Sequence, residues 1–102
     1  MTDQVFDGTR PRGHAYDTTI AEGGTAQVIF ESEEAQRGWA IYNPSATDWL
    51  WVSSSTEAAP NGVGSIPIAP LGGYETPPLY RPCGYVSVYG ATTGQPITGR
   101  CW

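Results

Sequence analysis

Lysine is absent from this 102-residue chain, and all of its cationic residues are arginines, namely Arg10, Arg12, Arg37, Arg81 and Arg100. Charged residues make up only 15% of the sequence and the net charge is −5. Proteins that bind nucleic acid need a dense cationic footprint to displace counterions from phosphates. Anionic membrane surfaces attract the same kind of basic cluster. We therefore expect neither nucleic acid nor a membrane among the partners.

Groups that commonly carry catalysis are also scarce. The single histidine, His14, falls near the N-terminus, no G-x-S-x-G turn accompanies it, and the lack of lysine excludes Schiff-base chemistry. There is no phosphate-binding loop or dinucleotide fingerprint. Asp48, Glu57 and Glu75 lie in or beside expected loops, but so small a domain has little room for the deep cleft that paired carboxylates need. We expect no enzyme and no cofactor.

The chain has two cysteines, Cys83 and Cys101. They belong to no C-x-x-C pair and no Cys/His cluster, so we expect no metal site. Two interpretations stay open: the two cysteines are separate thiols, or they form a disulfide, either within one chain or between two copies. A disulfide within the chain would tie the last expected strand to the loop before its neighbour and contribute about 3 kcal/mol. In a cytosolic protein this bond would form late, after exposure to oxidising conditions.

No apolar run approaches the roughly 18 residues that a membrane-spanning helix needs. The first residues, M-T-D-Q-V-F-D-G-T-R, contain neither the basic nor the apolar region of a secretory signal. We expect the protein to be made in the cytosol and to leave it, if at all, by lysis or inside a larger particle.

Short strand signals recur about every ten residues, separated by turns that use the 13 glycines and 9 prolines. The expected extended segments are Thr18–Ile20, Thr25–Phe30, Gly38–Asn43, Trp49–Ser53, Ser65–Ala69, a short edge piece within Pro70–Pro78, Gly84–Gly90 and Pro96–Trp102. This pattern predicts an all-β fold, an antiparallel β-sandwich or barrel of about 7–8 short strands. Residues 1–17 show no sustained periodicity and are expected to form an extended N-terminal arm, with residues 18–102 as the β-sandwich domain.

Two segments, Trp49–Ser53 and Gly84–Gly90, alternate cleanly between aliphatic and other side chains. Because side chains alternate across a strand, the aliphatic positions predict the core face and the aromatic positions a half-wet outer face. The residues expected inside are Ile41, Leu50, Val52, Ile66, Ile68, Val86, Val88 and Ile97. The aromatic residues expected outside are Trp49, Trp51, Tyr85 and Tyr89.

Two outward tryptophans at i and i+2 require something to cover them. The N-terminal arm or a loop of the same chain is one candidate, a subunit interface is a second, and a stacked sugar is a third. Tryptophan and tyrosine are the residues most enriched at interface hot spots, which supports the second. Trp102 leaves a similar choice between a neighbouring subunit and the edge of its own core.

The runs R-G-W-A-I-Y-N-P-S-A-T-D-W-L-W-V-S, N-G-V-G-S-I-P-I-A-P-L-G-G-Y-E-T-P-P and G-Y-V-S-V-Y-G-A-T-T-G-Q-P-I-T lie between Arg37 and Thr98. This part of the chain resembles small β-sandwich virion proteins of tailed bacteriophages and prophages. The resemblance is a pattern of turns and apolar positions, and it carries no catalytic residues.

The resemblance implies a virion structural protein, assembled in the host cytoplasm and released by lysis. We expect a capsid decoration or cement protein that binds the major capsid protein or other virion proteins as a homo-oligomer, with a trimer favoured. The residues expected to make contacts are Arg10 and Arg12 in the arm together with Trp49, Trp51, Tyr85, Tyr89 and Trp102. The alternative is a glycan- or receptor-recognition module of a fibre, spike or tail, and a neck or tail-completion protein is a third option.

Overall fold

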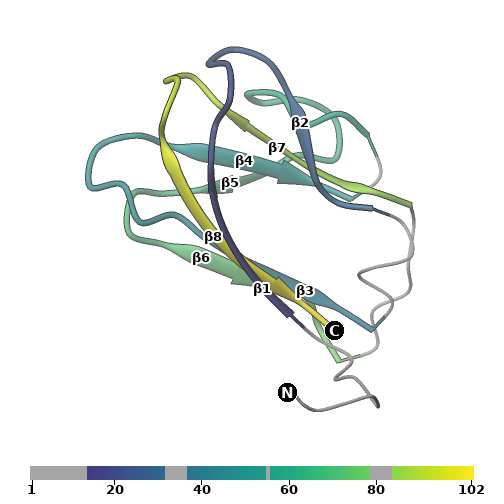
Figure 1. The fold of residues 1–102 in the computed structure, drawn as a ribbon. Coiled ribbons are helices and arrows are strands. Elements are labelled where there is room, and N and C mark those ends of the chain that lie inside the picture. The colour runs from purple at the N-terminus through teal and green to yellow at the C-terminus, as the bar shows by residue number, and fades with distance from the viewer. Residues whose placement is uncertain (1–13, 32–36, 55, 79–83) are drawn as a thin grey trace.

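The structure is a computed structural model that describes residues 14–31, 37–54, 56–78 and 84–102. These residues form eight strands and no helix. The strands make two antiparallel four-stranded sheets that pack face to face (Figure 1). The predicted all-β sandwich is therefore confirmed.

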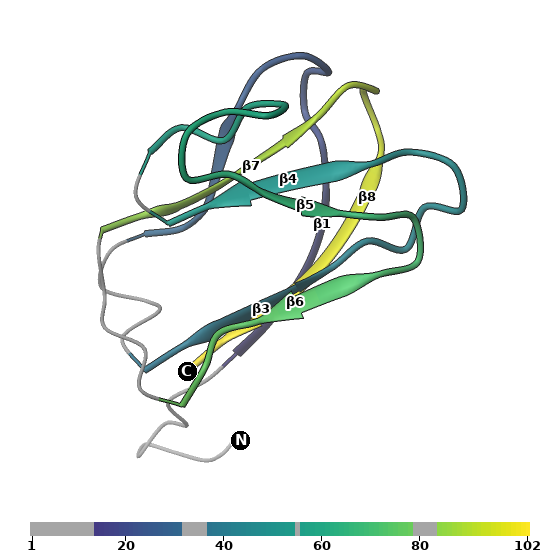
Figure 2. The same cartoon turned by 180° about the vertical axis from the view of Figure 1, so that it is seen from behind.

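Sheet A has the strand order β1-β8-β3-β6 and sheet B the order β2-β7-β4-β5. Figure 2 shows β4, β5 and β7 of sheet B lying above β3 and β6 of sheet A. The strands of sheet A are β1 (His14–Thr19), β8 (Pro96–Cys101), β3 (Trp39–Tyr42) and β6 (Gly73–Glu75). The strands of sheet B are β2 (Gln27–Phe30), β7 (Val86–Gly90), β4 (Leu50–Ser53) and β5 (Ile66–Ile68).

The core lies between the two sheets and contains the predicted aliphatic set. Seven of the eight expected residues are at most 2% exposed, and Ile66 is partly buried against the same cluster. Sequence reasoning missed four further members, Ile20, Phe30, Trp39 and Cys101. Each large aliphatic or aromatic side chain buried in this way stabilises the fold by about 1.5–3 kcal/mol.

The first strand begins earlier than the sequence indicated. β1 starts at His14 and pairs with β8 through a continuous register from His14–Cys101 to Thr19–Pro96. Residues 14–17 therefore belong to sheet A, although they were expected in the arm. Arg10, Arg12 and Cys83 lie outside the described residues, so the contacts and the disulfide expected of them stay predictions.

Buried Asn43 joins the loops at one end of the sandwich. Its side-chain Nδ2 donates to the carbonyl of Asp48 at 2.7 Å, and its Oδ1 accepts from the backbone N–H of Ser45 at 3.2 Å. Its backbone N–H reaches the carbonyl of Gly72 at 2.8 Å, and its own carbonyl accepts from Leu71 at 2.9 Å. Because its polar groups are satisfied inside the protein, Asn43 holds the β3–β4 and β5–β6 loops together at little desolvation cost.

Candidate interaction surface

A row of bulky side chains crosses the outer face of sheet B. In the strand register, Trp51 on β4 lies opposite Tyr89 on β7 and opposite Pro67 on β5. Trp51 and Tyr89 are half-buried and Pro67 is exposed. Trp49, two residues before Trp51 and just ahead of β4, is 51% exposed. We call Trp49, Trp51, Pro67 and Tyr89 the aromatic surface.

Two buried amide side chains fix the backbone that carries Trp49. Gln95 Nε2 donates to the carbonyl of Trp49 at 2.9 Å, and Asn43 Nδ2 donates to the neighbouring carbonyl of Asp48 at 2.7 Å. Both amides are at most 2% exposed. A surface held in this way loses little backbone entropy on binding, which favours affinity.

The chain itself covers the other half of this outer face. The Ser87 hydroxyl accepts from the backbone N–H of Ala58 at 2.8 Å and donates to the carbonyl of Thr56 at 3.1 Å. Ser53, opposite Ser87 in the register, accepts from the Thr56 N–H at 3.0 Å. Ala58 is only 2% exposed, so this part of the β4–β5 loop lies flat on sheet B. Serine at both outward positions is the sequence signal for this cover.

This cover separates Tyr85 from the aromatic surface. Tyr85 is 41% exposed and precedes β7, whereas Tyr89 lies near its other end, with Ser87 and the covering loop between them. Alternation had placed Tyr85 and Tyr89 on one face, but they do not form one patch. The structure therefore brings together Trp49, Trp51 and Tyr89 of the predicted set and leaves Tyr85 apart.

Trp102 packs against its own chain at the ends of the central strands β8 and β3 of sheet A. Its backbone N–H donates to the Gly38 carbonyl at 3.0 Å, and its carbonyl accepts from the N–H groups of Gly38 at 3.1 Å and Arg37 at 2.6 Å. The guanidinium carbon of Arg100 lies 4.9 Å from the ring centroid. A Cβ on residue 38 would lie 2.8 Å from the indole, so only glycine leaves room for the ring.

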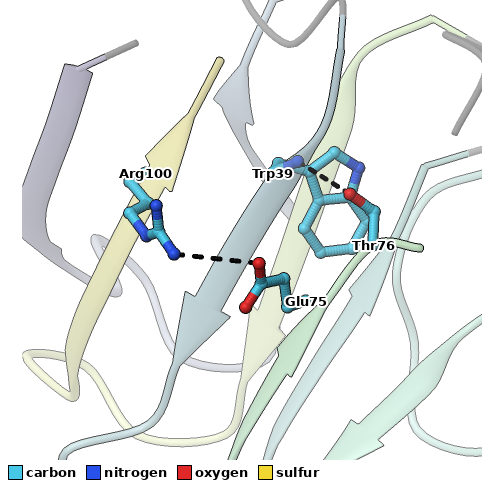
Figure 3. A network of polar contacts seen from close by, with 4 residues as sticks. All are labelled: Trp39, Glu75, Thr76 and Arg100. Atoms are coloured by element: carbon cyan, nitrogen blue, oxygen red, sulfur yellow. Dashed lines mark hydrogen bonds and ion pairs between the residues drawn. The ribbon is translucent and has the colours of Figure 1, made fainter. Parts of the chain in front are cut away.

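The outer face of sheet A is closed by its own polar side chains. Arg100 on β8 and Glu75 on β6 form an ion pair at 3.8 Å across Ala40 of β3, which is fully buried beneath them. On the same strand, the Trp39 backbone N–H donates to Thr76 Oγ1 at 3.1 Å (Figure 3). On this face Tyr42 is 38% exposed and Trp102 is half-buried, against 51% for Trp49 beside sheet B.

Among the described residues, no group of three or more His, Cys, Asp or Glu is placed to hold a metal ion. In the same part of the chain, no helix is long and apolar enough to cross a membrane. Comparison with known protein families, with curated proteins and with solved structures finds no match to this chain.

Proposed function

We propose that this protein is a structural component of a bacteriophage virion, a decoration or cement protein that binds the capsid through the aromatic surface. Its partner would be the major capsid protein or another virion protein, with assembly in the host cytoplasm and release by lysis. The observation that carries the proposal is the pairing of half-buried Trp51 and Tyr89 on the outer face of sheet B, next to the 51% exposed Trp49, whose backbone is held by Gln95.

The composition around this surface suits a protein partner. Between residues 38 and 74 the only charged side chains are Asp48 and Glu57. The centres of protein interfaces are depleted in charge and enriched in tryptophan and tyrosine. The resemblance of residues 37–98 to small phage virion proteins points to the same class of partner.

Co-sedimentation with capsids of the phage or prophage that encodes the chain tests the proposal. We expect Trp49→Ala to weaken binding at least about tenfold, as truncation of an aromatic hot spot does. Tyr42→Ala is the matched control, because Tyr42 is a 38% exposed aromatic residue on sheet A. The proposal would be contradicted if the wild-type protein stayed in the supernatant, or if both variants lost capsid binding to the same extent.

The proposed role of the N-terminal arm needs a truncation that spares the fold. Deleting residues 1–17 would remove His14–Asp17 and with them most of β1, so any loss of capsid binding would be ambiguous. Deleting residues 1–13 avoids this strand. We expect that variant to keep its melting temperature and to lose capsid occupancy, and unchanged occupancy would remove the arm, with Arg10 and Arg12, from the proposal.

A glycan- or receptor-recognition module of a fibre, spike or tail is the second candidate. It is favoured by the position of Trp51 between Tyr89 and Pro67 on three adjacent strands, because carbohydrate rings stack on aromatic side chains of this kind. A shift in tryptophan fluorescence on adding host-surface glycans, which is lost in Trp51→Ala, would support glycan binding over capsid binding. Imaging of labelled protein on virions would separate both from a neck or tail-completion role.

A further inference from the structure

The four edge strands of the sandwich differ in how well they resist pairing with another strand. Exposed strand edges recruit further strands unless they are short, bulged, proline-bearing or covered. β5 carries Pro67, β6 is only three residues long, and the register of β2 shifts between Val28 and Phe30. β1 has six residues, a regular register and no proline. Among the described edge strands, β1 is therefore the one that is neither short, bulged nor proline-bearing, and its charged side chain is Asp17.

The backbone hydrogen bonds at the end of β1 show which of its groups point away from β8. The N–H of Ile20 donates to the carbonyl of Gln95, and the Ile20 carbonyl accepts from Gly94, so both groups of Ile20 face the β8 side. Backbone groups alternate in direction along an antiparallel strand. Ala15, Asp17 and Thr19 therefore direct their N–H and C=O groups to the side of β1 away from β8, where no described strand pairs with them. Consistently, the Thr19 carbonyl accepts from the Gln27 side chain at 3.0 Å instead of from β8.

We propose that this edge pairs with the same edge of a second copy, so that sheet A continues across a two-fold axis between two β1 strands. A second copy is the partner that fits, because antiparallel self-pairing presents the same free groups from both sides and closes the contact. The strand pairing lies in sheet A, the aromatic surface lies on sheet B, and the pairing does not depend on the proposed function.

Charge selects the register of this pairing. With Asp17 opposite Asp17 of the second copy, two like charges would face each other directly, which is destabilising. Moving the axis to Tyr16 places Asp17 opposite Ala15 and pairs residues 14–18 of both copies. Each Ala15–Asp17 pair then exchanges both backbone hydrogen bonds, since both residues point their groups to this edge.

The neighbouring edge of sheet B adds apolar contact. A shallow hollow lined by Thr18, Gln27, Val28 and Ile29 lies between β1 and β2. Val28 is 45% exposed there. Edge-to-edge pairing of β1 brings this hollow against its counterpart, but one pair of short strands buries less than a standard interface. We therefore expect a dimer that dissociates on dilution.

Proline substitution tests the pairing by light scattering between about 1 and 500 µM, a range suited to a weak interface. Asp17→Pro removes an N–H that faces the open edge and leaves the β8 ladder intact, so the fold should tolerate it. We expect it to raise the dissociation constant at least about tenfold. Asp17→Ala is the matched control, because it removes the charge and keeps the N–H, and it should dimerise at least as well as the wild type.

Hydrogen exchange on the wild-type protein gives an answer even if Asp17→Pro fails to fold. We expect the amides of Ala15 and Asp17 to be protected at high concentration and to lose protection on dilution, while the amide of Thr18, in the β8 ladder, stays protected. A wild type that is monomeric at the highest concentration overturns the proposal. The proposal is also overturned if the Asp17→Pro variant dimerises as well as the wild type. It is likewise overturned if the protection of the Asp17 amide does not depend on protein concentration.

Discussion

The outer faces of the two sheets differ in the residues that lie next to their large side chains. On sheet A, Trp102 lies over Gly38, the Tyr42 ring lies over Gly73, and Arg100 meets Glu75 across Ala40. On sheet B, Trp51 has Tyr89 and Pro67 as its cross-strand neighbours.

The difference shows what makes an outward aromatic residue available for binding. On sheet A the rings of Trp102 and Tyr42 lie over Gly38 and Gly73, where a Cβ would lie 2.8 Å or less from a ring atom. Trp51 has Tyr89 and Pro67 as its cross-strand neighbours, so neither adjacent strand offers it a glycine. Neighbour size across the strands, more than the tryptophan itself, therefore separates the aromatic surface from the closed face of sheet A.

The largest expected effect contrasts an inward tryptophan with an outward one. Trp39 is 1% exposed and its ring centroid lies 5.5 Å from that of Tyr74, so Trp39→Ala should lower the free energy of unfolding by about 3–5 kcal/mol. Trp49→Ala should cost less than about 1 kcal/mol, because half of that side chain is already in water. Urea denaturation of both variants measures these free energies of unfolding. Similar losses of stability in the two variants would contradict the distinction between the inward and the outward tryptophan.

The next largest effect tests whether Gly38 is needed to leave room for the Trp102 ring on the outer face of sheet A. A Cβ at residue 38 would lie 2.6 Å from Thr76 Oγ1 as well as against the indole of Trp102. We expect Gly38→Ala to cost about 2 kcal/mol through this overpacking. The same substitution in a Trp102→Ala background should cost clearly less, and equal costs in a double-mutant cycle would show that the ring is not the obstacle.

A smaller effect is expected where the β4–β5 loop lies on the outer face of sheet B. Ser87→Ala leaves the buried N–H of Ala58 without its acceptor and should cost about 1–2 kcal/mol. Hydrogen exchange should show the Ala58 amide losing protection while the β4–β7 ladder keeps its own. Unchanged protection at Ala58 would mean that the loop is held down by other contacts.

The smallest effect is expected at the ion pair. Arg100 and Glu75 are both about half exposed, at 52% and 53%. Glu75→Gln should therefore change the free energy of unfolding by less than about 0.5 kcal/mol, and the change should vanish in 1 M salt. A loss above 1 kcal/mol that persists in salt would show that the closed face depends on this pair.

The parts of the fold that sequence reasoning predicted are those with a clean period of two. β4 and β7 alternate between aliphatic and other residues, and their inward sets are all buried. β3 has no such alternation, because Ala40 on its outer side is as buried as Trp39 and Ile41 on its inner side. Its outer side is covered by Arg100 and Glu75, which come from distant parts of the chain.

The interaction surface was predictable only in part for the same reason. Alternation placed Trp49, Trp51 and Tyr89 outside, but it could not reveal that Ser87 holds a loop between Tyr85 and Tyr89. The neighbours of Trp51 depend on the strand order, which periodicity does not encode. The start of β1 at His14 was missed because its pairing partner is β8, at the other end of the sequence.

The place of β8 has a consequence for when the protein can fold. β8 is the last of the described strands, yet it lies between β1 and β3 in sheet A. Until residues 96–101 have been synthesised, β1 has no partner in this sheet, and β2 likewise waits for β7. Folds dominated by such distant pairings fold slowly, in milliseconds to seconds. The early strands therefore remain exposed during translation, when a chain of low charge is most open to wrong pairing.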